Sequence, residues 1–287
     1  MKPEDWCFAS GAAVAREAAF LPSRAIEEMA SLAPQEVSTR LARTWFGPAE
    51  PLMHFDRLAR ERREKEFEYF DKVSPSRTLV DLLRLGLAAD HLRAGLFEVS
   101  DAAGGAELAA AVQKLALRSG SFCPYFLEEF RLPLPDPQPS ARLAASLLID
   151  SAELAIGSLL AADEESLRPG SAARARALTA KVSLRAVRQN VPKELLKNFF
   201  FRGALLTEEV KDFLQDYREP TALSLYPPGC PAGQEEGFLL SAADESKGQP
   251  FSSAVVLRYL LGYLDQERRL RRAVYGALGK IPAREAS

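Results

Sequence analysis

The residues best suited to metal binding or covalent catalysis are few in this chain and lie far apart. It contains two histidines, His54 and His91, and three cysteines, Cys7, Cys123 and Cys230. Neither histidine has a potential metal ligand three or four positions further on, and no Cys-x-x-Cys pair occurs. A structural zinc site needs about four such ligands at close spacing. The sequence therefore predicts neither a zinc site nor a disulfide framework, which is typical of a reducing compartment.

Two further patterns have the residue types of an active site without the required spacing. The pair Gly279-Lys280 lacks the upstream glycine and the following Ser or Thr of a phosphate-binding loop. Cys123 has no base near it in the sequence, and the acidic run 163–165 has the spacing of an exposed surface. We therefore expect no catalytic residue, no cofactor and no metal ion, and we predict that the chain is not an enzyme.

The charges are dense but balanced. Lys and Arg total 37, Asp and Glu total 39, and the formal net charge is −2. A nucleic-acid or anionic-lipid surface would need an excess of basic residues, so neither partner is expected. The start of the chain does not look like a secretory signal, and no apolar stretch approaches the ~20 residues of a membrane span. We expect a cytoplasmic protein. If it works at a membrane, other proteins must hold it there.

The spacing of apolar residues predicts an all-α fold. These residues recur mainly three and four positions apart, and strand-like alternation is scarce. Thr207 is a candidate N-cap with Glu208 and Glu209 in the first turn. The alternating charges of residues 60–66 indicate a solvent-exposed helix face that pairs with itself. The predicted helical segments are 10–46 (broken at Pro22 and Pro34), 52–71, 78–97, 106–118, 125–130, 141–162, 172–190, 207–214 and 252–278.

A proline-rich segment predicts the main internal boundary. Residues 132–139 hold four of the 19 prolines of the chain, and such a segment cannot continue a helix. We therefore predict N-terminal helical units over 1–131 and C-terminal helical units over 140–287. Residues 219–250 are rich in Pro and Gly and are predicted to form a long loop.

Segments at both ends of the chain carry a family resemblance. Residues 7–17 place small residues before Arg16, and residues 41–47 end in Thr, two aromatic residues and Gly. Residues 257–282 contain a Tyr-Leu helix, Glu267 followed by basic residues, and a Gly-Lys turn. In this order the segments resemble the C-type subunit family of V/A-type (vacuolar/archaeal-type) rotary ATPases, whose eukaryotic counterpart is the d-type subunit.

The middle of the chain resembles the same family more distantly. Residues 82–96 are similar to its Asp-Asn-Leu helix, with His91 where Asn is usual. Residues 180–188, followed by 199–206, resemble its leucine-and-basic helix and Gly-containing turn, with a Lys and a Ser where acidic and amide residues are usual. The chain therefore resembles a divergent member of the family.

The resemblance implies a fold, a function and partners. The fold would be a pyramid of pseudo-repeated three-helix units. The chain would be a non-catalytic central-stalk connector, peripheral on the cytoplasmic face of the membrane and present as one copy per complex. It would couple the shaft subunits to the proteolipid c-ring for proton or sodium transport. The alternative is a free-standing all-helical adaptor unrelated to ATPases, which would share the helices and the lack of catalytic groups.

A charged patch near the end of the chain is one candidate partner-binding site. Charges at the rim of a socket steer docking and fix its register. The patch consists of Glu267, Arg268, Arg269, Arg271 and Arg272. The same arginines would also suit the solvated face of a terminal helix, where they would interact with the helix dipole.

An aromatic triplet is the other candidate. Phe199, Phe200 and Phe201 cannot all point inward from one helix, because neighbouring side chains are set about 100° apart. At least one is expected to meet a binding partner or a neighbouring domain, since interfaces and cores both favour aromatic residues.

Overall fold

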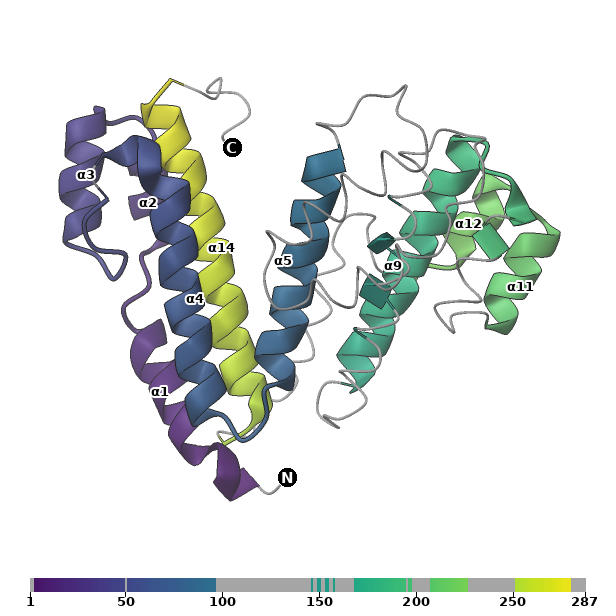
Figure 1. Cartoon of the computed structure of the whole chain (residues 1–287), viewed down its shortest axis with the longest axis horizontal. Helices are drawn as coiled ribbons and strands as arrows, with labels where there is room; N and C mark the ends of the chain where they lie inside the picture. Colours follow the sequence, from purple (N-terminus) through teal and green to yellow (C-terminus); the bar gives the residue numbers. More distant parts are fainter. Residues whose placement is uncertain are drawn as a thin grey trace. The chain divides into compact units, whose positions relative to one another are not determined.

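The computed structural model describes residues 3–49, 51–96, 168–194, 196–197, 207–226 and 251–279, together with 146, 149–150, 153–154 and 157. All regular elements in this part of the chain are helical and it contains no strand, which confirms the all-α prediction (Figure 1). The elements are η1 (Pro3–Trp6), α1 (Cys7–Glu17), α2 (Ser23–Met29), α3 (Pro34–Ala42), η2 (Leu52–His54), α4 (Phe55–Val73), α5 (Thr78–Leu96), α9 (Arg168–Arg188), α11 (Glu208–Gln215), α12 (Glu219–Ser224) and α14 (Ser253–Ala277). The predicted helices 106–118 and 125–130, the segment 132–139 and residues 199–201 lie outside the described residues.

Backbone contacts divide the chain into two compact units. Unit 1 contains Met1–Val80 and Ala243–Ser287, and unit 2 contains Asp81–Ala242. Segments from both ends of the sequence therefore belong to the same unit. This division differs from the predicted units 1–131 and 140–287, because α14 packs with helices from the first part of the chain.

Local sequence signals set the boundaries of the short helices in unit 1. Pro22 occupies the cap position of α2, and Pro34 begins α3, where its missing N–H is not needed. After α3, the backbone N–H of Phe46 donates to the Thr44 hydroxyl at 3.2 Å. Gly47 follows with a φ of +72°, a left-handed conformation that glycine adopts at little cost. Proline and glycine thus fix the turns that bring α2, α3 and α4 together.

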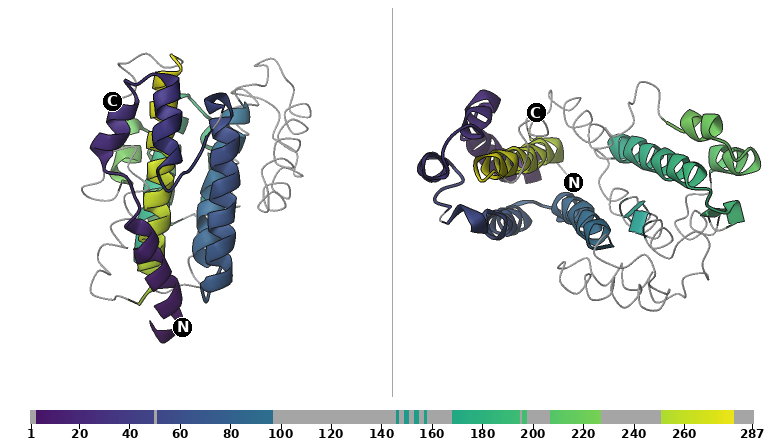
Figure 2. Two further views of the ribbon diagram at one scale, coloured as in Figure 1. Left: turned by 90° about the vertical axis from the view of Figure 1, so that its left-hand side faces the viewer. Right: turned by 90° about the horizontal axis from the view of Figure 1, so that it is seen from above.

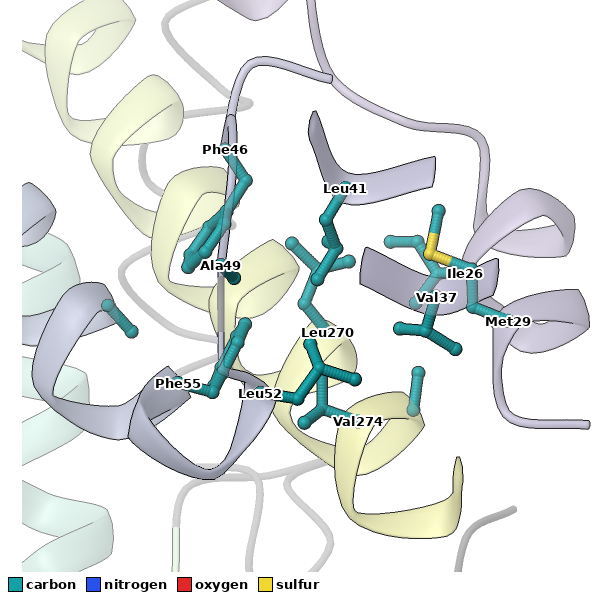
Figure 3. Close-up of a cluster of buried hydrophobic side chains, with 12 residues drawn as sticks. Ile26, Met29, Val37, Leu41, Phe46, Ala49, Leu52, Phe55, Leu270 and Val274 are labelled. Carbon is teal, nitrogen blue, oxygen red and sulfur yellow. The ribbon is translucent and has the colours of Figure 1, made fainter. Parts of the chain in front are cut away.

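The core of unit 1 gathers apolar side chains from α2, α3, the start of α4 and α14 (Figure 3). Phe46 and Phe55 stack in it with their ring centroids 4.8 Å apart. Burial of each large apolar side chain contributes about 1.5–3 kcal/mol. The buried members are Ile26, Met29, Val37, Leu41, Phe46, Ala49, Leu52, Phe55, Ala59, Leu270, Ala273 and Val274. The last three come from α14, so this helix completes a core that the short helices do not close alone.

Helix α14 is the central element of unit 1. It contacts α1, α2, α3 and α4, and both views of Figure 2 show it, in yellow, against the purple helices. Gln266 fastens it to the turn between α1 and α2. The side-chain amide donates to the carbonyl of Leu21 at 2.7 Å and accepts from the N–H of the same residue at 3.0 Å. Gly262 allows close approach, because a Cβ there would lie 2.9 Å from the ring of Phe20.

Unit 2 contains most of α5 together with α9, α11 and α12, and α9 packs against α12. The Thr207 hydroxyl accepts from the N–H of Val210 at 3.4 Å, which confirms the predicted N-cap of α11. The prediction of a loop over all of 219–250 is wrong at its start, since α12 begins at Glu219. Proline in its first turn is compatible with a helix because that N–H has no partner in the helix. Across the described residues, no helix has the length and apolar character needed to cross a membrane.

Candidate functional site

The acidic residue of the predicted charged patch is buried in unit 1. The Glu267 side chain is 3% exposed. Arg63 of α4 donates from Nη1 to its two oxygens at 3.0 and 3.3 Å, and Arg271 donates from Nη2 at 3.0 Å. Asp56 accepts from Arg271 at 2.8 Å and also from the Tyr275 hydroxyl. A carboxylate removed from water is stable only with such partners. Glu267 therefore joins α14 to α4 inside the unit.

A second ion pair joins α1 to α4. Nη1 of Arg16 lies 2.7 and 2.9 Å from the two oxygens of Glu66, and the Arg16 guanidinium lies over the ring of Tyr69, 4.0 Å from its centroid. Tyr259 of α14 donates its hydroxyl to Glu66 at 2.7 Å. The Glu66 side chain is 12% exposed and that of Arg16 is 40% exposed, so the carboxylate is shielded from water and the guanidinium only in part. Together with the Glu267 contacts, this pair ties α1, α4 and α14 into one assembly.

These contacts correct the interpretation of the charged run 60–66. The sequence predicts an exposed face that pairs with itself. Arg63 and Glu66 instead pair with residues of α14 and α1. The pair Arg57–Glu61, at 3.7 Å, does keep the expected spacing of four residues on the exposed side of α4. The prediction is therefore wrong for the inward face of this helix.

A pocket of about 310 Å³ opens between α1, the turn after α3, α4 and α14. Its aromatic lining residues are Phe20, Trp45, Phe46, Tyr259 and Tyr263. Phe20 stacks on Tyr259 with centroids 5.3 Å apart, and Trp45 meets Tyr263 at 4.7 Å. Ligand pockets in proteins are mostly lined by such apolar rings with a few polar groups among them. The pocket is therefore one candidate ligand site of unit 1, beside a larger pocket of about 690 Å³ that is lined by residues of α3, η2 and the end of α14.

Four charged side chains complete the lining, namely Arg16, Arg62, Lys65 and Glu66. The Arg62 guanidinium lies over the Phe46 ring, 4.1 Å from its centroid, and donates to the carbonyls of Gly47 and Pro48. Burial lowers the pKa of Arg62, while Tyr263 and Glu61 act in the opposite direction. The cations thus lie against aromatic rings, an arrangement that favours them electrostatically.

The two tyrosines of the pocket are held in their neutral form. Burial, and then the hydrogen bond to Glu66, raise the pKa of Tyr259 well above its ordinary value. Burial, and then the carboxylates of Glu267 and Glu66, raise the pKa of Tyr263 in the same direction. Both hydroxyls therefore keep their protons at neutral pH. They are suited to donate hydrogen bonds and not to attack as phenolates.

Unit 2 contains a different buried charge cluster. Arg93 donates to Asp150 and Asp90, each at 2.8 Å, and also to Glu153. Arg185 donates to the other oxygen of Asp150. Burial opposes the charge on Arg93, but Glu153 and then Asp150 outweigh it and raise its pKa. The cluster therefore holds α5, α9 and the residues 150 and 153 together through charge.

The residues of the predicted charged patch do not form one exposed surface. Glu267 is buried and Arg271 pairs with it inside the unit. Arg269 pairs with Asp265 at 2.8 Å and donates to the Ser23 hydroxyl. Of the arginines in this patch, Arg268, Arg269 and Arg271 are half-buried and Arg272 is exposed. Residues 199–201, the other candidate site, lie outside the described residues.

Sequence reasoning missed the pocket and its residues. Tyr259 and Tyr263 are four positions apart, a spacing that places two rings on one helix face. That signal was present, but the partners of the pair, Trp45 and Arg62, come from distant parts of the sequence. Within the described residues, no group of His, Cys, Asp and Glu is arranged to hold a metal ion.

In comparisons with known proteins, the chain matches no family model, no curated protein and no solved structure.

Proposed function

We propose that this chain is a non-catalytic central-stalk connector of a V/A-type rotary ATPase, a divergent relative of the C-type subunit family. In this role it couples the shaft subunits to the membrane proteolipid ring during proton or sodium transport, or during ATP synthesis. It is peripheral on the cytoplasmic face of the membrane and is present as one copy per complex. The finer fold that goes with this role is a pyramid of pseudo-repeated three-helix units.

One observation carries the proposal: the family-like segments from the two ends of the chain meet in unit 1. Arg16, from the opening segment, lies beside Tyr259 of the closing segment through their shared partner Glu66. Trp45, from the segment that ends in Gly47, contacts Tyr263. Segments that resembled the family only by chance would have no reason to contact one another in the folded chain. The contacts therefore favour a common origin for the pattern.

The packing of unit 1 also suits a part that transmits force. Torque passes through a connector only when its packed surfaces barely deform, as is normal at protein packing density. The buried ion pair Arg63–Glu267 at 3.0 Å joins α4 to α14, and the partly exposed pair Arg16–Glu66 at 2.7 Å joins α1 to α4. Breaking such pairs is costly because each leaves a charge without its partner. The unit is accordingly stiff in the direction that joins these helices.

The proposal is tested by asking what binds the protein in its native host. A tagged copy is expressed there, the membranes are solubilised gently, and co-purifying proteins are identified by mass spectrometry. The expected result is recovery of the proteolipid ring and the shaft subunits, with one copy of this chain per complex. A monomer that carries neither partner would contradict the proposal and would favour a free-standing adaptor.

A pair of charge reversals sharpens this test. Arg272 is exposed on α14, so Arg272→Glu changes the charge of the candidate patch without touching the buried pairs. The matched control is Arg24→Glu on α2, because Arg24 is also exposed, with 89% of its side chain accessible. If the patch contacts a partner, recovery falls for Arg272→Glu and not for the control. Equal recovery of both variants would remove Arg272 from the interface.

A further inference from the structure

The pocket of unit 1 holds more positive than negative charge. Its lining contains Arg16, Arg62 and Lys65 but a single carboxylate, that of Glu66. Arg16 lies 2.7 Å from Glu66, so these two charges offset each other. Arg62 donates only to main-chain carbonyls, at 3.4 Å to Gly47 and 2.6 Å to Pro48. Among the described residues, Arg62 and Lys65 have no carboxylate partner within ion-pair distance.

A hydroxyl group in the same pocket, that of Tyr263, donates to no side chain or carbonyl of the described residues. Tyr263 is 4% exposed and lines the pocket, and its contacts are with the rings of Trp45 and Tyr259. No described residue accepts a hydrogen bond from its hydroxyl. This hydroxyl is not among the fully buried polar atoms of the described residues, so a ligand in the pocket can reach it and serve as its partner. Its neighbour Tyr259 does have one, the carboxylate of Glu66 at 2.7 Å.

The accessible polar groups of the pocket that have no carboxylate partner are all donors. The Tyr263 hydroxyl, the remaining N–H groups of Arg62 and the ammonium of Lys65 can each donate to a ligand in place of water. An oxyanion, such as a carboxylate or a phosphate, supplies several acceptor positions and a negative charge at once. The ring walls formed by Phe20 and Trp45 suit a flat apolar body attached to that anion. The volume of about 310 Å³ lies at the lower end of ligand pockets, which limits the body to about one ring.

We propose that this pocket is a binding site for a small organic anion, in which a carboxylate or phosphate group meets Tyr263, Arg62 and Lys65 and a flat ring packs against Trp45 and Phe20. This site is separate from the connector role and does not depend on it. A chain that fails to bind ATPase partners would still bind the anion, and the reverse also holds.

The binding test uses the full chain with phenyl phosphate and benzoate as probes and benzyl alcohol as the neutral control. Isothermal titration calorimetry measures affinity, and nitrogen-15 NMR locates the site through the indole N–H signals of the two tryptophans. Trp45 lines the pocket, whereas Trp6 lies in η1 and is 3% exposed. Saturable binding of both anions, with a shift of the Trp45 signal and none of Trp6, is the expected result. The Trp45→Phe variant assigns the signal.

Variants of single residues then distinguish specific recognition of the anion from nonspecific binding. Tyr263→Phe removes one oxygen and keeps the ring packing, and it is expected to weaken phenyl phosphate about tenfold. Lys65→Gln removes an exposed cation of the pocket and has a smaller effect in the same direction. Arg57→Gln, on the same helix but outside the pocket and paired with Glu61, leaves the affinity unchanged. Circular dichroism checks that each variant is folded.

Three outcomes would contradict the proposed anion-binding site. The first is the absence of heat and of any Trp45 shift at millimolar probe. The second is equal affinity for benzyl alcohol and benzoate, which would indicate apolar binding without an anion contact. The third is unchanged affinity for phenyl phosphate in folded Tyr263→Phe, because the Tyr263 hydroxyl would then have no part in recognition.

Discussion

The buried charge clusters of the two units are built in opposite ways. In unit 1 the carboxylate of Glu267 lies between Arg63 and Arg271 and is more buried than either, while Arg271 also pairs with Asp56. In unit 2 Arg93 lies among three acids, of which Asp150 and Glu153 are buried more deeply than Arg93 itself, and Arg185 also pairs with Asp150. Each unit therefore depends on one central charge, and the two central charges have opposite sign.

The clusters also differ in the distance along the chain that they bridge. Arg63 and Glu267 are 204 positions apart, whereas Arg93 and Glu153 are 60 apart. Closure of a longer loop costs more conformational entropy, although the cost rises only slowly with length. Unit 1 therefore relies on contacts between chain ends, and unit 2 on contacts within the middle of the chain. The predictions below test whether the two units respond separately.

The largest effect is expected from removal of the central charge of either cluster. Glu267→Ala leaves Arg63 buried without its carboxylate and is expected to lower the free energy of unfolding of unit 1 by about 3–5 kcal/mol. Arg93→Ala does the same for unit 2, where it removes the arginine that pairs with Glu153 and leaves Asp150 with Arg185 alone. Urea titration followed by circular dichroism measures the loss, and limited proteolysis shows which unit opens.

The control for both variants is Arg272→Ala, an exposed arginine on α14, which is expected to change stability by less than about 0.5 kcal/mol. Opening of unit 2 in Glu267→Ala, or of unit 1 in Arg93→Ala, would show that the two clusters are not independent. A loss no larger than the control would show that Glu267 is not a determinant of unit 1.

Substitution by alanine is expected to change the stability of unit 1 in opposite directions at two of its glycines. Alanine favours a helix over glycine by about 1 kcal/mol. At Gly262 the new Cβ would lie 2.9 Å from Phe20, a ring stacked on Tyr259, and overpacking of this kind costs about 1–3 kcal/mol. At Gly11, on α1, no atom lies within 4 Å. Gly11→Ala should therefore stabilise unit 1 by up to about 1 kcal/mol, and Gly262→Ala should destabilise it by about 1 kcal/mol.

Thermal unfolding of the two variants measures this difference directly. Each substitution is the control for the other, since both change a helical glycine to alanine in the same unit. A stabilising effect of Gly262→Ala would mean that Phe20 moves aside freely, and the close contact of α14 with the end of α1 would then not constrain the pocket.

An effect of similar size for each residue is expected at alkaline pH. The pKa of Tyr259 and that of Tyr263 are raised, mainly by burial, above the ordinary value of 10.0. A raised pKa in the folded state means that this stabilisation is complete below pH 10 and is lost as the pH rises further. Each tyrosine should therefore cost unit 1 about 1 kcal/mol at pH 11. In unit 2, burial raises the pKa of Tyr217 to about 12, so the sign is the same there.

Urea titrations at pH 9 and pH 11 test this dependence. Tyr263→Phe should show a smaller loss between the two pH values than the unmodified chain, because it has one buried phenol fewer. An unchanged pH dependence in this variant would show that the Tyr263 hydroxyl ionises as freely in the folded state as in the unfolded state.

The helices of this protein were largely predictable because their limits are local. Pro22 and Pro34 mark the starts of α2 and α3, and Thr207 caps α11 as its sequence indicates. The apolar spacing of residues 252–278 also predicted α14 within a residue or two. Helix α12 was missed, because the Pro and Gly content after it dominated the interpretation of residues 219–250.

The candidate site was not predictable, because it depends on which helix faces meet. The run 60–66 has the charge pattern of an exposed helix, and nothing local distinguishes Arg63, which meets Glu267, from Arg57, which meets Glu61. Likewise, Glu267 stands in a run of basic residues that is typical of a solvated helix. The orientation of α14 is set by apolar packing over its whole length, and only that packing shows which charges are buried.

The joining of distant segments in unit 1 has a consequence for how the protein is made. Helices α1 to α4 leave the ribosome early, but the helix that completes their core, α14, follows only after the 162 residues of unit 2. At translation rates of about 5–20 residues per second, their apolar faces stay without α14 for on the order of ten seconds or more. During this interval the early helices are a natural substrate for chaperones. Unit 2 can complete its own contacts first, so the middle of the chain is expected to fold before the ends.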